Sequence, residues 1–401
     1  MRLGFFAYPW DLLDEGPEAA VEAMARQLGC NAIALNANYH HARFLRPRAK
    51  GPKTLELPGA VAAFQPQPDL YPDDALMPVP DPALVESGVL AQARAACAKD
   101  GLDFGLWTVG LHNSTLGEQN RHLCMETCFG DCYTYSLCPA HAPVRAFLQG
   151  VIRDLCAQFQ PDRIIQEAVG YLGARHWVHH ELFFVDWDEG LELLLSLCFC
   201  PACQARGDAA GLDVPALRQN VAGLAEHLLH QERGSLPPAF AQSYPTSLLF
   251  EIRDLPEYLR VRADSVTELV RGLQSAAAEQ GASLDLIPAS FQRPVSRAWL
   301  EGAHLGQLGT VSDSLLIPAY HDSAAQVAAD LDWAARLAPG SALAAGLNAC
   351  NPAVSSAAEI AAQAQACVAA GCQGIYTYNY GLLTPDRLGW VAGANREVQG
   401  Q

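Results

Sequence analysis

The chain carries little charge, and little positive charge in particular. Only 17% of its 401 residues are charged, and 26 Lys and Arg face 43 Asp and Glu, which gives a net charge of −17. Such an acidic chain repels nucleic-acid phosphates and anionic lipid headgroups, so we expect neither a nucleic-acid partner nor a membrane partner. A neutral substrate such as a sugar meets no such repulsion.

Several other features are missing. No apolar run reaches the roughly 20 residues that a membrane span requires. The stretch Met1–Tyr8 lacks the apolar core and cleavage site of a signal peptide, so we expect a cytoplasmic protein. The absence of a glycine-rich phosphate loop argues against a nucleotide cofactor, and the absence of a G-x-S-x-G elbow argues against a serine hydrolase.

Half of the residues are hydrophobic, which excludes a disordered chain. Short apolar runs alternate with alanine-rich helical patterns, and this alternation is typical of a parallel sheet. We expect strands at Leu3–Tyr8, Ala32–Asn36, Asp103–Val109, Arg163–Glu167, Leu284–Ala289, Ser314–Pro318, Ala342–Leu347 and Gly374–Tyr378. Helices are expected at Glu18–Leu28, Val85–Asp100, Val144–Gln158, Leu259–Gln280, Ser323–Leu337 and Ala357–Ala370.

Eight such units predict a single (β/α)8 barrel, a TIM barrel, over residues 1–401. Two insertions interrupt it on the catalytic face, at about 41–82 and 169–256. The first is rich in Pro and Gly and is expected to be a loop. No stretch of the chain has the composition of a linker between independent domains.

Barrel enzymes carry their chemistry at the carboxyl ends of the strands, and those ends are rich here in aromatic, amide and imidazole groups. Aromatic rings offer apolar faces to sugar rings, while amides and imidazoles bind hydroxyl groups. The candidate substrate-binding residues are Tyr8, Trp10, Asn36, His40, His112, Asn113, Gln166, Tyr320, His321, Asn348, Tyr378 and Asn379. Glu167, a carboxylate at an apolar strand end, is the candidate general acid/base.

Thirteen cysteines are many for a reduced cytoplasmic chain, and clustered ones favour a metal site over disulfides. The run Cys198-Phe199-Cys200-Pro201-Ala202-Cys203 brings three thiols together, and structural zinc prefers four ligands. We take Cys138 as the fourth ligand. A second group, Cys124, Cys128 and Cys132, is spaced by about one helical turn and forms either another metal site or part of a loop.

Glu167, the C-x-C-x-x-C run and the upstream Cys138-Pro139 together resemble family 42 of the glycoside hydrolases, the β-galactosidases. In that family a glutamate ends strand four as general acid/base, and four such cysteines hold zinc. The resemblance therefore implies a barrel glycosidase with structural zinc on Cys138, Cys198, Cys200 and Cys203. Because related proteins often form trimers, it also implies a possible homo-oligomer.

The chain departs from that family at two places. Gln166 stands where the family has an asparagine, and residues 344–350 of strand seven contain no carboxylate where the family has its nucleophile. The family's retaining mechanism and its β-galactoside substrates therefore do not carry over. Asp322 is our candidate for the second catalytic group, although it could instead cap the next helix. Asp186, Asp188, Glu251 and Asp254 of the long insertion are further candidates.

Two other functions stay open. His176, His180 and Glu181 could hold a catalytic metal, and a metal-dependent sugar isomerase or epimerase is one alternative. We favour a substrate-binding loop for this histidine-rich stretch. A non-catalytic carbohydrate-binding barrel is the other alternative, since a strand-seven nucleophile is missing. In each case the partner is a small molecule or an oligosaccharide.

Overall fold

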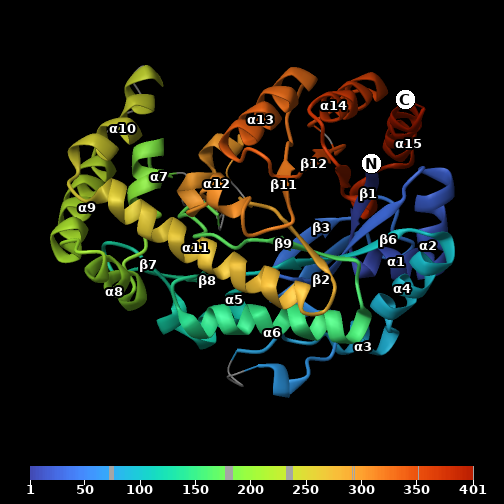
Figure 1. The fold of residues 1–401 in the computed structure, drawn as a ribbon, viewed down its shortest axis with the longest axis horizontal. Helices are drawn as coiled ribbons and strands as arrows, with labels where there is room; N and C mark the ends of the chain where they lie inside the picture. The colour runs from blue at the N-terminus through green and yellow to red at the C-terminus, as the bar shows by residue number, and fades with distance from the viewer. Residues whose placement is uncertain are drawn as a thin grey trace.

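The computed structural model describes residues 1–71, 76–176, 184–231, 238–290, 292, 294–350 and 352–400. Eight parallel strands close into a barrel, because β1 pairs with both β2 and β13 (Figure 1). The barrel strands are β1 (Arg2–Ala7), β2 (Ala32–Tyr39), β6 (Asp103–Val109), β9 (Arg163–Glu167), β10 (Ser283–Leu286), β11 (Ser314–Pro318), β12 (Leu343–Asn348) and β13 (Gly374–Tyr378). The predicted (β/α)8 barrel and the positions of its eight strands are confirmed.

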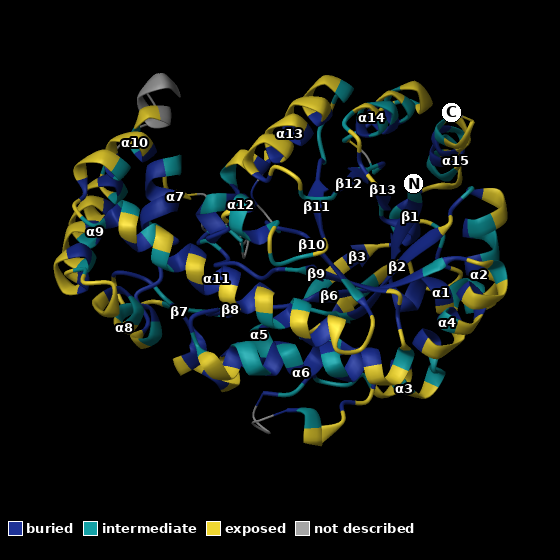
Figure 2. Cartoon of the chain, viewed as in Figure 1, coloured by how far each residue is buried: buried dark blue, intermediate teal, exposed yellow. Residues whose placement is uncertain are grey.

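Amphipathic helices surround the barrel and turn their apolar faces inward (Figure 2). They are α2 (Pro17–Glu22), α4 (Val89–Asp100), α6 (Ala142–Phe159), α11 (Leu255–Ala278), α13 (Ala324–Leu337), α14 (Ala357–Ala369) and α15 (Pro385–Gln399). The helix predicted over Glu18–Leu28 is α2 followed by a π-helical turn, η1 (Ala23–Gln27). In the described part of the chain, every helix is too short or too polar to cross a membrane.

A buried ion network closes the barrel at the amino ends of its strands. Arg163 donates to both carboxylate oxygens of Asp103 at 2.6 Å and to Asp285 at 3.1 Å. Each charge in this network has a partner, as burial requires. The network stabilises this end of the barrel.

The insertion after β2 is more ordered than the predicted loop. Strands β3 (Ala42–Leu45) and β4 (Thr54–Leu57) form an antiparallel hairpin, and β5 (Val61–Ala62) pairs with β2. The prediction of a loop is wrong here because backbone pairing in the hairpin outweighs the high Pro and Gly content of the segment.

The connections after β6 and β9 also carry structure of their own. After β6 come α5 (Ser114–Gln119), β7 (Cys124–Glu126) and β8 (Cys132–Leu137). After β9 come α7 (Glu189–Leu195), α8 (Pro201–Ala209), α9 (Val214–Leu229) and α10 (Pro238–Glu251). Figure 1 shows these four helices gathered at one end of the molecule, beside the amino-terminal part of α11. The predicted insertion at 169–256 is therefore a small helical layer.

Candidate functional site

A cavity of about 280 Å³ lies at the carboxyl ends of the strands. All eight barrel strands supply its wall, from residues in their carboxyl-terminal halves or from residues that follow them. The lining residues are Phe6, Tyr39, Trp107, Glu167, Ile287, Ser290, Pro318, Tyr320, Asn348 and Tyr378. The cavity therefore combines aromatic faces with hydroxyl, amide and carboxylate groups.

Glu167 is the last residue of β9 and is half-buried. Its Oε2 accepts a hydrogen bond of 2.8 Å from the indole nitrogen of Trp107, which lies on the neighbouring strand β6. This bond fixes the carboxylate against the aromatic wall. Among the described lining residues, Glu167 is the only carboxylate.

Three tyrosine hydroxyl groups meet beside Glu167. The hydroxyl of the buried Tyr8 lies 3.1 Å from that of Tyr39 and 2.8 Å from that of Tyr378. Burial raises the pKa of Tyr39, and nearby Glu167 raises it further. Burial also raises the pKa of Tyr378 well above its ordinary value. These phenols therefore stay protonated at neutral pH, and they act as hydrogen-bonding groups rather than as nucleophiles.

The structure brings four predicted residues into this one cavity, namely Glu167, Tyr320, Asn348 and Tyr378. The rings of Tyr320 and Tyr378 lie 5.7 Å apart. The side-chain oxygen of Asn348 accepts a hydrogen bond from the amide of Cys350, so its amide nitrogen is held in a fixed direction.

Tyr8 and Trp10 lie behind the wall of the cavity rather than in it. Their rings stack at 4.7 Å, and both residues are buried. The ring of Tyr8 packs against the rings of Tyr39 and Trp107, and its hydroxyl lies beside those of Tyr39 and Tyr378. The two residues are not among the lining residues and support the aromatic wall from behind.

The four predicted amides outside the lining are engaged with the protein. Asn36 donates to the backbone carbonyl of Asn38, and Gln166 is buried between β6 and β9, where it accepts from a threonine hydroxyl. Asn113 accepts from a backbone N–H and caps α5. Asn379 accepts from the amide of Gly381. Each amide holds a strand end or a turn in place.

The ring of His40 stacks on that of His112, and the ring of His176 meets His112 edge-on. The rings of His40 and His112 lie 3.8 Å apart, and His176 Nε2 lies 3.0 Å from His112 Nδ1. Burial lowers the pKa of His40 to about 4 and that of His176 to about 3, and it lowers the pKa of His112 well below its ordinary value. All three imidazoles are therefore neutral at pH 7. His180 and Glu181 lie outside the described residues.

The candidates for a second catalytic carboxylate lie apart from Glu167. Asp322 is exposed and does not line the cavity, and Ser323, not Asp322, caps α13. Asp322 instead donates its backbone N–H to the side chain of Gln326. Asp188 caps α7. Also outside the lining are Asp186, Glu251 and Asp254.

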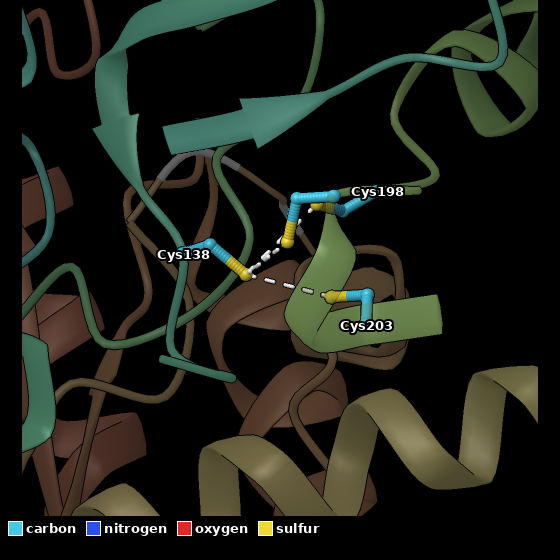
Figure 3. A group of neighbouring side chains, drawn as sticks. Cys138, Cys198 and Cys203 are labelled. Carbon is cyan, nitrogen blue, oxygen red and sulfur yellow. Dashed lines mark hydrogen bonds between the residues drawn. The ribbon is translucent and has the colours of Figure 1, made fainter. Parts of the chain in front are cut away.

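Four buried cysteines form one compact group, and their Sγ atoms all lie within 4.8 Å of one another. Cys138 follows β8, while Cys198, Cys200 and Cys203 lie before and within α8. Figure 3 shows the side chains of Cys138, Cys198 and Cys203 pointing toward one another. The Sγ of Cys138 lies 3.9, 3.6 and 3.5 Å from those of Cys198, Cys200 and Cys203. This group could hold a metal ion.

The second cysteine group is different. Cys124 and Cys132 lie on the paired strands β7 and β8, with Cys128 in the connection between them. The segment forms a hairpin, so the spacing of these cysteines does not place them on one face of a helix. Within the described residues, these thiols are not part of a group of three or more metal-ligating side chains.

The sequence analysis did not select Tyr39, Trp107 or Phe6, which also line the cavity. Tyr39 ends β2 and satisfies the strand-end rule, so that rule could have found it. Trp107 and Phe6 lie inside their strands, where side chains alternate between the barrel interior and the helices. An aromatic side chain at an inward-facing strand position was the sequence feature that could have identified them as lining residues.

Comparison with known proteins supports the fold. No protein-family model and no curated protein matches the chain. The catalytic domain of β-amylase from Paenibacillus polymyxa has a TM-score of 0.61 at 10% identity, over 100% of this chain and 98% of that one. A β-galactosidase from Halorubrum lacusprofundi has a TM-score of 0.59 at 15% identity, over 100% of this chain and 58% of that one.

An α-L-fucosidase isoenzyme from Paenibacillus thiaminolyticus has a TM-score of 0.56 at 12% identity, over 99% of this chain and 49% of that one. The chain thus spans about half the length of this neighbour. These structural neighbours are glycoside hydrolases built on barrels. At such low identities the likeness shows the fold alone, and a relation to family 42 in particular is not confirmed.

Proposed function

We propose that this protein hydrolyses a glycosidic bond in a neutral saccharide, with Glu167 as the proton donor. One observation carries the proposal: a carboxylate lies in an aromatic cavity at the carboxyl end of the barrel, where an indole N–H holds it in place. The glycoside hydrolases among the structural neighbours support the same reaction class.

Cleavage of a glycosidic bond requires a proton donor at the leaving oxygen. Glu167 is positioned for this role. Aromatic rings of the wall can pack against the apolar face of a sugar ring, while the hydroxyl groups of Tyr39, Tyr320 and Tyr378 can bind its hydroxyls. The net charge of −17 favours a neutral saccharide over a phosphorylated or sulfated one.

We propose zinc as the occupant of the four-cysteine group. Four thiolates at about 2.3 Å from a tetrahedral zinc would lie about 3.8 Å apart. The measured separations from Cys138 of 3.5 to 3.9 Å fit this geometry. Such a closed site leaves no ligand position for substrate, so the ion would be structural. It would join the end of β8 to the start of α8.

A saccharide-binding barrel without hydrolytic activity is the second candidate. It is favoured by the single carboxylate among the described lining residues, since both common glycosidase mechanisms use two. A metal-dependent isomerase would require carboxylates and imidazoles that converge on an ion. Within the described residues, the only group of three or more such ligands is the four-cysteine group.

The test compares the wild type with Glu167→Gln on aryl glycosides and oligosaccharides. Loss of a general acid costs about 10²- to 10⁴-fold in kcat for a poor leaving group. We expect a much smaller loss for dinitrophenyl glycosides, whose leaving group needs no proton. Glu118→Gln, an exposed glutamate of α5, is the control.

Equal activity of Glu167→Gln and the wild type would refute the assignment of Glu167. If no glycoside is hydrolysed, but a saccharide binds to the wild type and binds more weakly to Tyr378→Phe, the binding-protein candidate replaces the enzyme.

A further inference from the structure

A second pocket, of about 360 Å³, lies between α13 and the start of the 3-10 helix η5 (Val295–Glu301). Tyr320 lines the first cavity and the next residue, His321, lines this second pocket, so one short segment separates the two. The pocket is lined by Pro294, Ser296, His321, Gln326, Ala329, Asp330 and Trp333. The last four share one face of α13, at helical spacings of three and four residues.

His321 is held in a fixed orientation by Asp330. The carboxylate of Asp330 is buried, and its Oδ2 lies 2.8 Å from His321 Nε2. Its Oδ1 accepts a hydrogen bond of 2.7 Å from the amide of Val295. Both carboxylate oxygens are thus engaged, so the pocket offers a ligand no bare negative charge. When the neutral imidazole donates through Nε2, its Nδ1 is left as a hydrogen-bond acceptor.

Trp333 supplies an apolar surface to this pocket. Its side chain is 45% exposed, although a large aromatic group is usually buried. An amide and a hydroxyl group lie beside it in the lining. Gln326 accepts from the amide of Asp322 through its oxygen, which leaves its two N–H groups for another partner, and Ser296 adds a hydroxyl.

We propose that this pocket is a second saccharide-binding site, distinct from the Glu167 cavity. The face of Trp333 would pack against the C–H face of a pyranose ring. The imidazole of His321 would accept a hydrogen bond from a hydroxyl of the ring, and the amide N–H groups of Gln326 would donate to its hydroxyls. An aromatic face beside neutral donors and acceptors suits a ring that is apolar on its face and polar at its edge.

The choice of a saccharide, rather than another neutral ring, rests on the proposed function. Because the two pockets are adjacent, the second would retain a remote part of a saccharide chain near the cavity. Predicted residue His321 would then bind substrate at this second site.

The experiment measures binding apart from hydrolysis, in the Glu167→Gln protein. The indole N–H signals of the seven tryptophans are followed by NMR while maltohexaose, cellohexaose, xylohexaose or β-1,4-galactotetraose is added. Trp333→Ala assigns the signal of Trp333. We expect saturable movement of this signal with at least one saccharide. In Trp333→Ala, where this signal is absent, titration calorimetry should give a Kd about tenfold higher, because the buried aromatic face is lost.

Two further variants sharpen the result. His321→Ala should also weaken the binding, whereas Leu337→Ala, which removes a 42% exposed side chain one turn further along α13, should leave it unchanged. Melting temperatures of all variants establish that they are folded.

The outcomes separate this proposal from the proposed function. If a saccharide is hydrolysed by the wild type while Trp333 stays unmoved, the second site is refuted and the proposed function stands. If Trp333 responds while no saccharide is hydrolysed, the second site stands and the proposed function falls. If no saccharide of the panel moves Trp333, the second site is refuted.

Discussion

Replacement of Cys200 by alanine tests the proposed zinc site. Cys200 lies in the buried four-cysteine group, and the three remaining thiols cannot complete a tetrahedral ligand set. Free zinc at about a thousand times its Kd stabilises the folded state by about 4 kcal/mol. Unfolding entropy scales with length, and for a chain of 401 residues it is about 0.8 kcal/mol per degree. Loss of the ion should therefore lower the melting temperature by about 5 °C.

The assay combines elemental analysis with thermal unfolding on the same sample. The wild type should carry about one zinc per chain and lose it to a strong chelator, with the same fall in melting temperature. Cys97→Ala is the matched control, because Cys97 is an equally buried thiol in α4 outside the group. Its zinc content should be unchanged. The reasoning is refuted if Cys200→Ala keeps its zinc, or if the wild type neither contains nor takes up the ion.

Three further predictions concern the barrel mouth. Tyr378→Phe removes the hydroxyl that lies 2.8 Å from Tyr8, and kcat/KM for the best glycoside should fall about tenfold, as measured by initial rates. Asn113→Ala removes the cap of α5 and should cost about 1 kcal/mol in urea unfolding, while Asn113→Asp should cost little. Burial depresses the pKa of His40 and His176, so the unfolded chain binds more protons below about pH 6.5. The free energy of unfolding should therefore fall as the pH drops from 6.5 toward 4, by up to about 1.4 kcal/mol per pH unit for each imidazole, and less in His40→Gln.

The barrel could be predicted from the sequence because its strands are buried on both faces. The run Leu315-Leu316-Ile317 is continuously hydrophobic, without the alternation of polar and apolar residues seen in half-exposed strands. Continuous hydrophobic runs are typical of parallel strands that are buried on both faces. The hairpin β3–β4 was not predictable from the same signal. Its strands are short and partly exposed, and they are fixed by pairing with each other rather than by burial.

The strand-end rule identified the right region but not the right side chains. Neighbouring residues at a strand end point in different directions. Tyr320 thus lines the cavity, while His321 bonds to Asp330 outside it. Asn113 satisfies the rule by position, but its amide is needed by the helix that follows. The direction in which a side chain points depends on the local backbone geometry, which cannot be predicted from the residue type alone.

The cysteine group was easier to predict than the cavity. Three of its thiols are close in sequence, so that any compact fold of the segment brings them together. Only Cys138 required a long-range assignment, and the resemblance to a known cysteine pattern supplied it. The cavity has no such group of residues close together in sequence, since its lining comes from all eight strands of the barrel.

The tyrosine cluster has a consequence for the order in which the molecule forms. Tyr8 and Tyr39 come from the first two strands, and Tyr378 comes from the last. The hydrogen bond between Tyr8 and Tyr378 spans the seam where β1 meets β13. During synthesis, the edge of β1 and the hydroxyl of Tyr8 lack these partners until more than three hundred further residues have emerged. The cavity is therefore among the last parts to assemble, and binding of the proposed saccharide there would report that the barrel has closed.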